Sequence, residues 1–259
     1  MYKLSIITIN YNNLEGLKRT IESIVNQTWQ EFEYVIIDGG STDGSAAYIE
    51  SQSAHFDYWV SEPDKGIYNA MNKGIAKATG EYLLFLNSGD HLFKQNILAE
   101  NHHTMKYFDL IYFDLQIIDR NECFINEYPD ILTFSYFVKN TLPHPATFIK
   151  RNLFAKRGLY DESLKIVSDW KLLMVSVCKY GSSYLKVNKT MSVFYLDGFS
   201  SSSENRELLL KEREQVLNDE FAFFIHDNEE INYLRGVVSN LRKSRKINWL
   251  IKLGLIDKF

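Results

Sequence analysis

The sequence has few of the features that would place a protein in a membrane or in an oxidising compartment. It has only two cysteines, Cys123 and Cys178, and neither lies in a CxxC pair or beside a pair of histidines. A zinc site and a disulfide framework are therefore not indicated. No apolar run approaches the roughly 18 residues that a transmembrane helix needs. The opening MYKLSIITINYNN lacks the charged start, apolar block and cleavage site of a secretory signal, so we expect a cytoplasmic protein.

Strong charge and phosphate-binding loops are also missing. With 29 basic and 33 acidic residues the net charge is -4, so no field over the whole molecule attracts nucleic acid, and we expect no nucleic-acid partner. The first turn reads Asn10-Tyr11-Asn12-Asn13 rather than GxGxxG, and no GxxxxGK followed by Ser or Thr occurs. A phosphate bound by this protein would need another counter-charge.

The first ninety residues alternate between strand and helix patterns. KLSIITI is a continuous apolar run of the kind that central parallel strands show. The apolar residues between positions 14 and 25 then follow a helical spacing. FEYVIID, DYWVSE and EYLLFL repeat the strand pattern, with helical stretches between them. This alternation predicts an α/β fold, with a mostly parallel, Rossmann-like central sheet and helices on both faces.

The regular alternation weakens after Asp90. DLIYFDLQIID predicts an edge or hairpin strand, SDWKLLMVSVCKYG predicts a helix, and the chain from Arg206 onward is helical by composition. The expected organisation is a domain over 1–205, with a first half over 1–90 and a second half over 91–205, followed by a helical, basic segment over 206–259.

Polar side chains stand at or just beyond the ends of four predicted strands: Asn10, Asp38, Asp64 and Asp90. Taken singly, each has an ordinary explanation as a helix cap or a turn residue. Together they favour a polar ligand, because ligands of such sheets bind beyond the carboxyl ends of the strands. A diphosphate balanced by Mn²⁺ or Mg²⁺ at Asp90 suits this edge, since these ions commonly bind one or two carboxylates and take other ligands from phosphate and water. The small Ser88 would let the diphosphate approach the backbone.

Three linked motifs resemble the amino-terminal half of family 2 glycosyltransferases of the GT-A type. They are SIITINYN, VIIDGGSTDGS and SEPDKGIYNAMNKGIAKATGEYLLFLNSGD, which together run from residue 5 to residue 90. The resemblance implies an inverting enzyme that moves a sugar from a nucleotide-diphosphate donor, expected to be a UDP-sugar. It also implies a saccharide or lipid-linked saccharide as the acceptor, in the synthesis of a cell-surface polysaccharide.

The same resemblance implies a donor site. It places Asp38 against the base of the nucleotide, and it places Asp64, Asn72 and Lys73 in the segment that closes over the nucleotide. Each of these three residues has an alternative explanation: Asp64 as a turn residue, Asn72 as an amide on a helix face, and Lys73 as a solvated lysine. The donor-binding residues that we predict are Asn10, Asn12, Asp38, Asp64, Asn72, Lys73 and Ser88.

Two positions depart from the family pattern. Gly39 stands where many members have a second Asp, and Asn87-Ser88-Gly89-Asp90 stands where a D-x-D or D-D motif is usual. Only Asp90 keeps its acid, which predicts a metal site that the donor completes. The reduced motif leaves an alternative open, a non-catalytic nucleotide-sugar-binding or assembly protein on the same fold. A nucleotidyltransferase is less favoured because the first loop lacks a glycine-rich, basic segment.

Inverting transfer needs a carboxylate that takes the proton of the acceptor hydroxyl. The resemblance places Asp169, in KIVSDWKLL, in this catalytic role, with Trp170 beside it to stack on a sugar; a helix cap by Ser168 or Asp169 is the alternative. His144, in LPHPATFIKR, is the predicted acceptor contact, and a structural hydrogen-bonding role is its alternative. The DGFSSSS stretch is similar to a G-G-x-S segment of the family and is either a lid over the donor or an ordinary surface loop.

The segment 235–252 is basic and contains no acid. Its cations are interleaved with aliphatic residues and Trp249, a composition that suits a helix on an anionic membrane surface. A solvated helix that packs on its own domain is the alternative, and the sequence leaves both open.

Overall fold

The computed structural model describes residues 2–119, 122–196 and 203–258. The chain divides into two compact units, Met1–Glu212 and Arg213–Phe259. The predicted lid over 197–203 lies outside the described residues except for Ser203. The predicted division at residue 205 stays a prediction.

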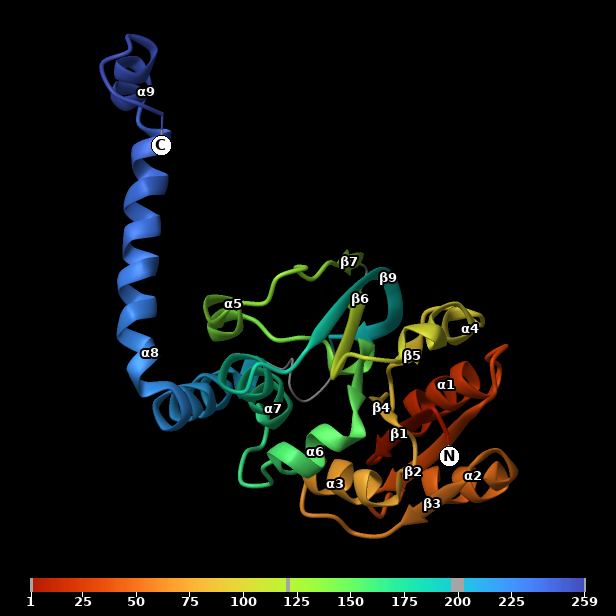
Figure 1. Ribbon diagram of the computed structural model, residues 1–259. Coiled ribbons are helices and arrows are strands. Elements are labelled where there is room, and N and C mark those ends of the chain that lie inside the picture. The colour runs from red at the N-terminus through yellow and green to blue at the C-terminus, as the bar shows by residue number, and fades with distance from the viewer. Residues whose placement is uncertain (1, 120–121, 197–202, 259) are drawn as a thin grey trace. The chain divides into compact units, whose positions relative to one another are not determined.

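In the described part of the chain, nine strands form one sheet in the order β3-β2-β1-β4-β8-β6-β9-β5, with β7 paired to β6 (Figure 1). β1 to β4 pair with one another in parallel, whereas β8 lies antiparallel between β4 and β6. β6 and β9 are parallel, and β5 and β7 are antiparallel to their neighbours. The strands are β1 (Leu4–Asn10), β2 (Phe32–Asp38), β3 (Tyr58–Ser61), β4 (Tyr82–Phe85), β5 (His91–Leu92), β6 (Leu110–Asp119), β7 (Glu122–Asn126), β8 (Thr147–Lys150) and β9 (Tyr184–Tyr195).

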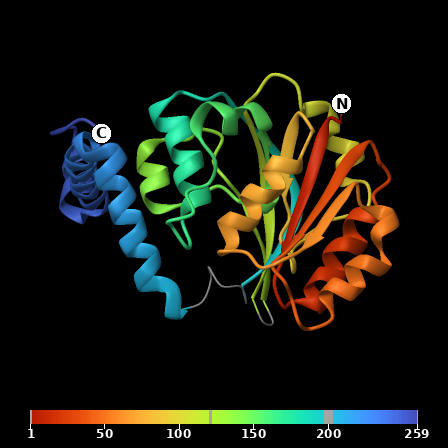
Figure 2. The ribbon, with the colours of Figure 1, turned by 90° about the horizontal axis from the view of Figure 1, so that it is seen from below.

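Helices cover both faces of the parallel part of the sheet (Figure 2). Because side chains alternate along a strand, Ile6 of β1 lies in the core with Leu17 and Ile21 of α1, whereas Ile7 points to α3. A Cβ atom at Gly74 of α3 would lie 2.5 Å from Ile7 Cγ2, so this close packing needs glycine. The helices are α1 (Leu14–Val25), α2 (Ser45–Ser51), α3 (Ile67–Lys77), α4 (Ile97–Asn101), α5 (Phe134–Lys139), α6 (Arg151–Arg157), α7 (Ser168–Met174), α8 (Arg206–Lys243) and α9 (Arg245–Lys252). The predicted α/β fold with a C-terminal helical appendage is confirmed.

Three details of the strands differ from the sequence-based expectation. β3 ends at Ser61, before Asp64, and β4 ends at Phe85, so both acids lie in the loops beyond their strands. DLIYFDLQIID forms β6, which makes the predicted hairpin with β7 but lies between β8 and β9 rather than at an edge. The first six residues of β6 are buried, as a central position requires.

Glu212 of α8 fixes the segment that leads into α7. Its carboxylate accepts hydrogen bonds from the backbone N–H groups of Lys165 (2.7 Å), Ile166 (3.0 Å) and Val167 (3.3 Å), and the residue is 6% exposed. Unpaired backbone N–H groups are costly in a buried site. Glu212 therefore holds the backbone immediately before the helix that carries Asp169.

The predicted basic helix over 235–252 is two helices. α8 has a kink at Phe221 (φ -138°, ψ 24°) and ends at Lys243. Ser244 has an extended backbone and caps α9, with its Oγ accepting from the Ile247 N–H at 3.5 Å. Among the helices that the structure describes, none has the length and apolarity to cross a bilayer.

We expect Glu212→Ala to lower the free energy of unfolding by on the order of 2 to 4 kcal/mol, because three backbone donors lose a charged acceptor. Urea unfolding followed by circular dichroism measures the change. Glu214→Ala is the matched control, since Glu214 lies in the same helix and is exposed, and we expect a change within about 0.5 kcal/mol. Equal stability of the two variants would show that Glu212 does not anchor this segment.

Candidate active site

The carboxyl ends of β1 and β2 meet at Asn10 and Asp38, which are partners in the parallel register. The fully buried Asp38 carboxylate accepts hydrogen bonds from Asn10 Nδ2 (2.7 Å), Ser41 Oγ (2.6 Å), the Ser41 N–H (2.9 Å) and Ser61 Oγ (2.6 Å). Burial opposes ionisation, but the hydrogen bonds from Ser41, Ser61 and Asn10 outweigh it and hold the pKa of Asp38 below its ordinary value. Asp38 thus shapes the loop after β2. Its contact with a nucleotide base would require one of these donors to move, and it stays a prediction.

The loop after β1 joins the neighbouring strand ends. Asn12 has a left-handed backbone (φ 48°), and its Oδ1 accepts from the Thr42 N–H at 2.8 Å. Asn13 caps α1, and its Nδ2 donates to the Ser88 carbonyl at 3.1 Å. Asn10 ends β1, and Asn12 and Ser88 lie on loops that hydrogen bonds tie into the same edge of the sheet.

The turn from Asn87 to Asp90 is held by α1. Thr20 Oγ1 donates to the Asp90 carbonyl (2.6 Å) and accepts from the Gly89 N–H (3.0 Å). Gly89 has φ 111°, which a residue with a side chain rarely adopts. Asp90 is 6% exposed, so the residue is largely shielded from solvent.

Asp169, His144 and Asn87 form a continuous line of polar contacts. Asp169 Oδ2 lies 3.4 Å from His144 Nδ1, and His144 Nε2 lies 3.3 Å from Asn87 Nδ2. The Tyr68 hydroxyl lies 3.0 Å from Asp169 Oδ1 and 2.6 Å from the Ile166 carbonyl, so the two oxygens share its single proton. The side chains of His144 and Asp169 are only 18% and 15% exposed. The line connects the start of α7 to the turn that carries Asp90.

His144 and Asp169 stabilise each other's charged form. Burial by itself lowers the pKa of His144, but the hydrogen bond and charge of Asp169, with a further contribution from Asp90, raise the pKa above its ordinary value. Burial by itself raises the pKa of Asp169, but the hydrogen bond and charge of His144, with the Trp170 N–H and Tyr68, lower it. A protonated imidazole donates from both nitrogens, and Asn87 Oδ1, which is buried with no hydrogen-bond partner among the described residues, would accept after a half-turn of its amide.

Three predicted donor residues make protein contacts in the segment around α3. The Asp64 carboxylate accepts from the backbone of its own turn at 2.8 Å. Asn72, 7% exposed, donates to the Tyr160 carbonyl (2.9 Å) and accepts from the Tyr160 N–H (3.0 Å). Lys73 forms an ion pair with Glu62 at 2.7 Å. Only the Asp64 contact matches its alternative explanation, a turn residue, because Asn72 is buried and Lys73 is paired rather than solvated. The donor roles of the three stay predictions.

The predicted stacking of Trp170 on a sugar is wrong for this structure. Trp170 is 1% exposed and donates from Nε1 to the Phe137 carbonyl at 2.8 Å, so its ring belongs to the core. An aromatic side chain this large buries well when its polar atom finds a partner. Ser168 and Asp169 do not cap α7, which was the alternative explanation for them. Val167 is the N-cap residue, and no side chain caps the helix.

Sequence reasoning missed two residues that contact the predicted catalytic groups, Tyr68 and Asn87. Tyr68 lies inside the quoted motif PDKGIYNAMNKG, one helical turn before Asn72, on the face of α3 that is buried. Asn87 lies in the quoted turn NSGD. Both positions were visible in the sequence, but their contacts with Asp169 and His144 join residues that are 101 and 57 positions apart.

The oxygen atoms at the sheet edge suit a hard cation that is shared with a ligand. Within the described ranges, no group of three or more His, Cys, Asp or Glu side chains could hold a metal ion. A single carboxylate at Asp90, beside the small Ser88 and Gly89, fits Mg²⁺ or Mn²⁺ whose other ligands come from phosphate and water.

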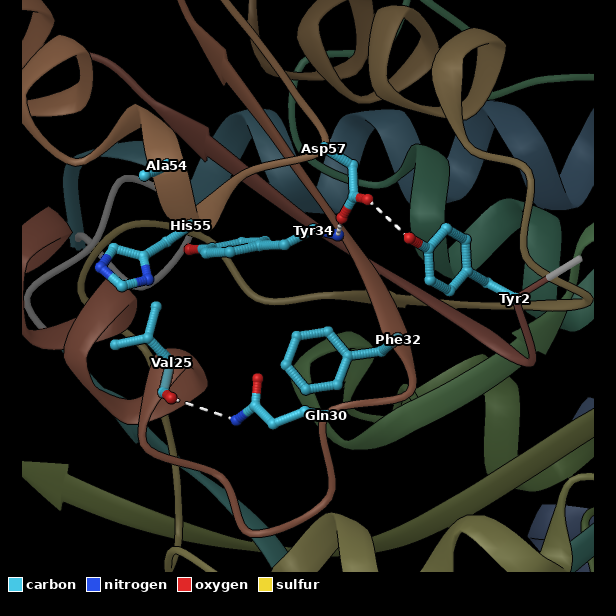
Figure 3. A pocket seen from close by; sticks show the side chains of 8 residues that line it. All are labelled: Tyr2, Val25, Gln30, Phe32, Tyr34, Ala54, His55 and Asp57. Carbon is cyan, nitrogen blue, oxygen red and sulfur yellow. Dashed lines mark hydrogen bonds between the residues drawn. The ribbon is translucent and has the colours of Figure 1, made fainter.

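A hollow of about 290 Å³ lies at the opposite end of the same strands (Figure 3). Tyr2 and Phe32, which line it, lie at the amino ends of β1 and β2. Its acid, Asp57, already accepts from the Tyr2 hydroxyl (2.8 Å) and from the Tyr34 N–H (2.8 Å). The hollow is therefore separate from the polar groups at the carboxyl edge.

Comparison with known proteins places the chain in a family. The model of the Glycosyl transferase family 2 matches residues 5–101. An uncharacterised glycosyltransferase of Mycobacterium tuberculosis is 35% identical over 176 residues, which are 66% of this chain and 67% of the relative. A PGL/p-HBAD biosynthesis glycosyltransferase of Mycobacterium bovis is 32% identical over 175 residues, 64% of this chain and 66% of the relative.

Solved structures agree on the fold. TarS of S. aureus in complex with UDP-GlcNAc has a TM-score of 0.60 at 17% identity, over 85% of this chain and 73% of that chain. The mannosyltransferase PcManGT of Pyrobaculum calidifontis in complex with GDP-Man and Mn²⁺ has a TM-score of 0.60 at 16% identity, over 86% of this chain and 64% of that chain. The fold is that of GT-A glycosyltransferases. The chain belongs to glycosyltransferase family 2, and it is a glycosyltransferase enzyme, which confirms the resemblance and sets aside the non-catalytic alternative.

The ion pair predicts a pH window for stability. Because folding raises the pKa of His144, the pair stabilises the folded state fully at pH values below the unfolded pKa of His144. Because folding lowers the pKa of Asp169, the pair stabilises the folded state fully at pH values above the unfolded pKa of Asp169. We expect His144→Gln to lose most stability relative to the wild type between about pH 4 and 6.5. The difference should shrink as the pH rises through the folded pKa of His144 or falls through that of Asp169.

Urea unfolding at several pH values measures this difference. His103→Gln, which replaces an exposed histidine, is the matched control and should show no such window. A loss in His144→Gln that is constant from acid to alkaline pH would rule out the ion pair.

Proposed function

We propose that the enzyme transfers a sugar from a nucleoside-diphosphate donor to an acceptor hydroxyl with inversion at the anomeric carbon. The observation that carries this proposal is the position of the Asp169 carboxylate, which Tyr68 and His144 hold in one line with the turn that carries Asp90. The two carboxylates to which we assign the roles of base and metal anchor are therefore linked by one line of contacts. The structural relatives support a donor of this class, since their complexes contain UDP-GlcNAc and GDP-Man.

Asp169 is the proposed general base. The acceptor oxygen forms a bond to the anomeric carbon, its proton passes to an Asp169 oxygen, and the bond to the diphosphate breaks with its electron pair on the leaving oxygen. The lowered pKa keeps Asp169 ionised at neutral pH. Tyr68 and His144 restrain the carboxylate, and such orientation lowers the entropic part of the barrier.

Asp90 is the proposed anchor for a divalent cation. Mn²⁺ or Mg²⁺ bound there would balance the charge that develops on the departing diphosphate. The Mn²⁺ in the mannosyltransferase complex supports this choice of ion. The imidazolium of His144, whose pKa Asp90 helps to raise, adds a second positive charge on the same side.

The acceptor is proposed to be a saccharide or a lipid-linked saccharide of a cell surface. The Mycobacterium bovis relative is named for PGL/p-HBAD biosynthesis, which supports a role in a biosynthetic glycosylation. Contact with a membrane stays a prediction, and α9 is the part that suits it. Its exposed Trp249 (61%) lies among Arg245, Lys246 and Lys252, and Leu253 beyond it is 53% exposed.

We expect Asp169→Asn to lower kcat by about 10²-fold or more, the range for loss of a general base, while the affinity for the donor stays within a factor of two to three. Product formation from a labelled nucleotide-sugar gives kcat, and calorimetry gives the affinity. Asp161→Asn is the matched control, because Asp161 precedes the same helix and its carboxylate is already paired with Lys171 at 2.7 Å. A fully active Asp169→Asn enzyme would remove Asp169 from the mechanism.

We expect Asp90→Asn to weaken donor binding only when Mn²⁺ is present. A ligand that binds the native state raises its stability, so the shift in melting temperature caused by UDP or GDP and their sugars, with and without Mn²⁺, reports the effect. The wild type should show a larger shift with Mn²⁺ than without it, and the variant should show equal shifts. A Mn²⁺-dependent shift that Asp90→Asn leaves unchanged would contradict the proposed anchor.

A further inference from the structure

The part of α8 after the kink carries an exposed apolar stripe. Ile231, Leu234, Val238 and Leu241 follow one another at spacings of three, four and three residues, and they are 43%, 51%, 37% and 39% exposed. Residues 229–243 are otherwise exposed as well, apart from the half-buried Asn232. A helical segment of this length is marginal in water unless it packs on a partner.

The spacing and the residue types match a two-stranded parallel coiled coil. In heptad terms Ile231 and Val238 occupy position a, and Leu234 and Leu241 occupy position d. Branched residues at a with leucine at d favour two parallel strands over higher numbers. The next d position toward the amino end is Asp227, which ends the apolar seam and makes it short.

The charges beside the seam are complementary between two copies. Glu230 occupies position g, and Arg235 occupies position e of the following heptad. In a parallel pair, position g of one helix faces position e of the next heptad on the other helix. Each dimer would therefore have two Glu230–Arg235 pairs, one on either side of the seam.

A membrane surface fits this stripe less well. Asp227 lies in line with the stripe and Glu230 lies beside it, and an anionic surface repels such residues. A second copy of the same chain is the occupant that both the spacing and the charges favour.

We propose that residues 230–241 of α8 pair with the same residues of a second copy as a short parallel coiled coil, which makes the enzyme a homodimer. The pairing would be isologous, the same surface on both subunits, as closed dimers require. Because the seam has only two heptads, the association should depend on protein concentration. This inference does not depend on the proposed catalytic roles.

Sedimentation velocity of the full chain over a range of concentrations tests the proposal. We expect the wild type to change from monomer to dimer as the concentration rises, and Leu234→Glu to remain a monomer. Tyr233→Glu is the matched control, since Tyr233 is 71% exposed on the same helix but off the seam, and it should dimerise like the wild type. A wild type that is monomeric throughout, or variants that behave alike, would overturn the proposal.

A charge exchange tests the parallel orientation. Glu230→Arg should weaken the dimer, because two arginines then face each other across the seam. The double variant Glu230→Arg with Arg235→Glu should restore the dimer, because an arginine at position 230 then faces a glutamate at position 235 of the other copy. A double variant no stronger than the single one would exclude the parallel pairing. Circular dichroism of each variant shows that helix content is retained.

Membrane binding is the competing outcome and can be separated from dimerisation. Co-sedimentation with vesicles of phosphatidylglycerol and phosphatidylcholine measures it. Vesicle binding that Leu234→Glu abolishes, in a wild type that is monomeric in solution, would assign the stripe to lipid and overturn the dimer. Vesicle binding that Leu234→Glu leaves intact, together with loss of the dimer, supports the proposal.

Discussion

The ion pair between Asp169 and His144 is the interaction on which the candidate site depends. Removing two charged side chains from water is costly, and only a close partner with further hydrogen bonds offsets the cost. Tyr68 and Asn87 extend the pair on either side. Loss of either member would leave the other charge in a largely buried position. Because His144 also contacts Asn87, the pair holds the start of α7 close to the turn that carries Asp90.

The parallel register supplies the other side of the site. It places Asn10 opposite Asp38 at the ends of two neighbouring strands, where ordered hydrogen bonds then fix the loops. Thr20 of α1 fixes the turn at Asp90 in the same way. Sites on rigid elements hold their groups more precisely than sites on free loops, and here the polar groups follow strands that are buried along their full length.

The sequence predicted well what local pattern determines. The parallel strands, the helices on both faces and the edge with Asn10, Asp38 and Asp90 follow from apolar periodicity and from the rule that parallel strands end together. The family resemblance pointed to Asp169 and His144, and the structure brings these two together. Their contact was not predictable, because it depends on how residues far apart in sequence pack.

The errors have the same origin. Trp170 was assigned to a sugar because it follows Asp169, but neighbouring positions on a helix point in different directions, and this one points into the core. The segment 235–252 was treated as one helix because its composition is uniform, whereas Ser244 changes the backbone direction with one extended residue. Asn72, whose donor role stays a prediction, ties α3 to the Tyr160 backbone, a contact that its position in the motif did not reveal.

The central claim is that the diphosphate of the donor lies at the turn that carries Asp90, between the strand edge and the Asp169–His144 pair. A crystal structure of the protein with UDP and Mn²⁺ tests it most directly. We predict Mn²⁺ bonded to an Asp90 oxygen and to the diphosphate, with His144 on the near side. A nucleotide bound elsewhere, such as in the hollow beside Tyr2 and Phe32, with Asp90 free of metal, would contradict the account.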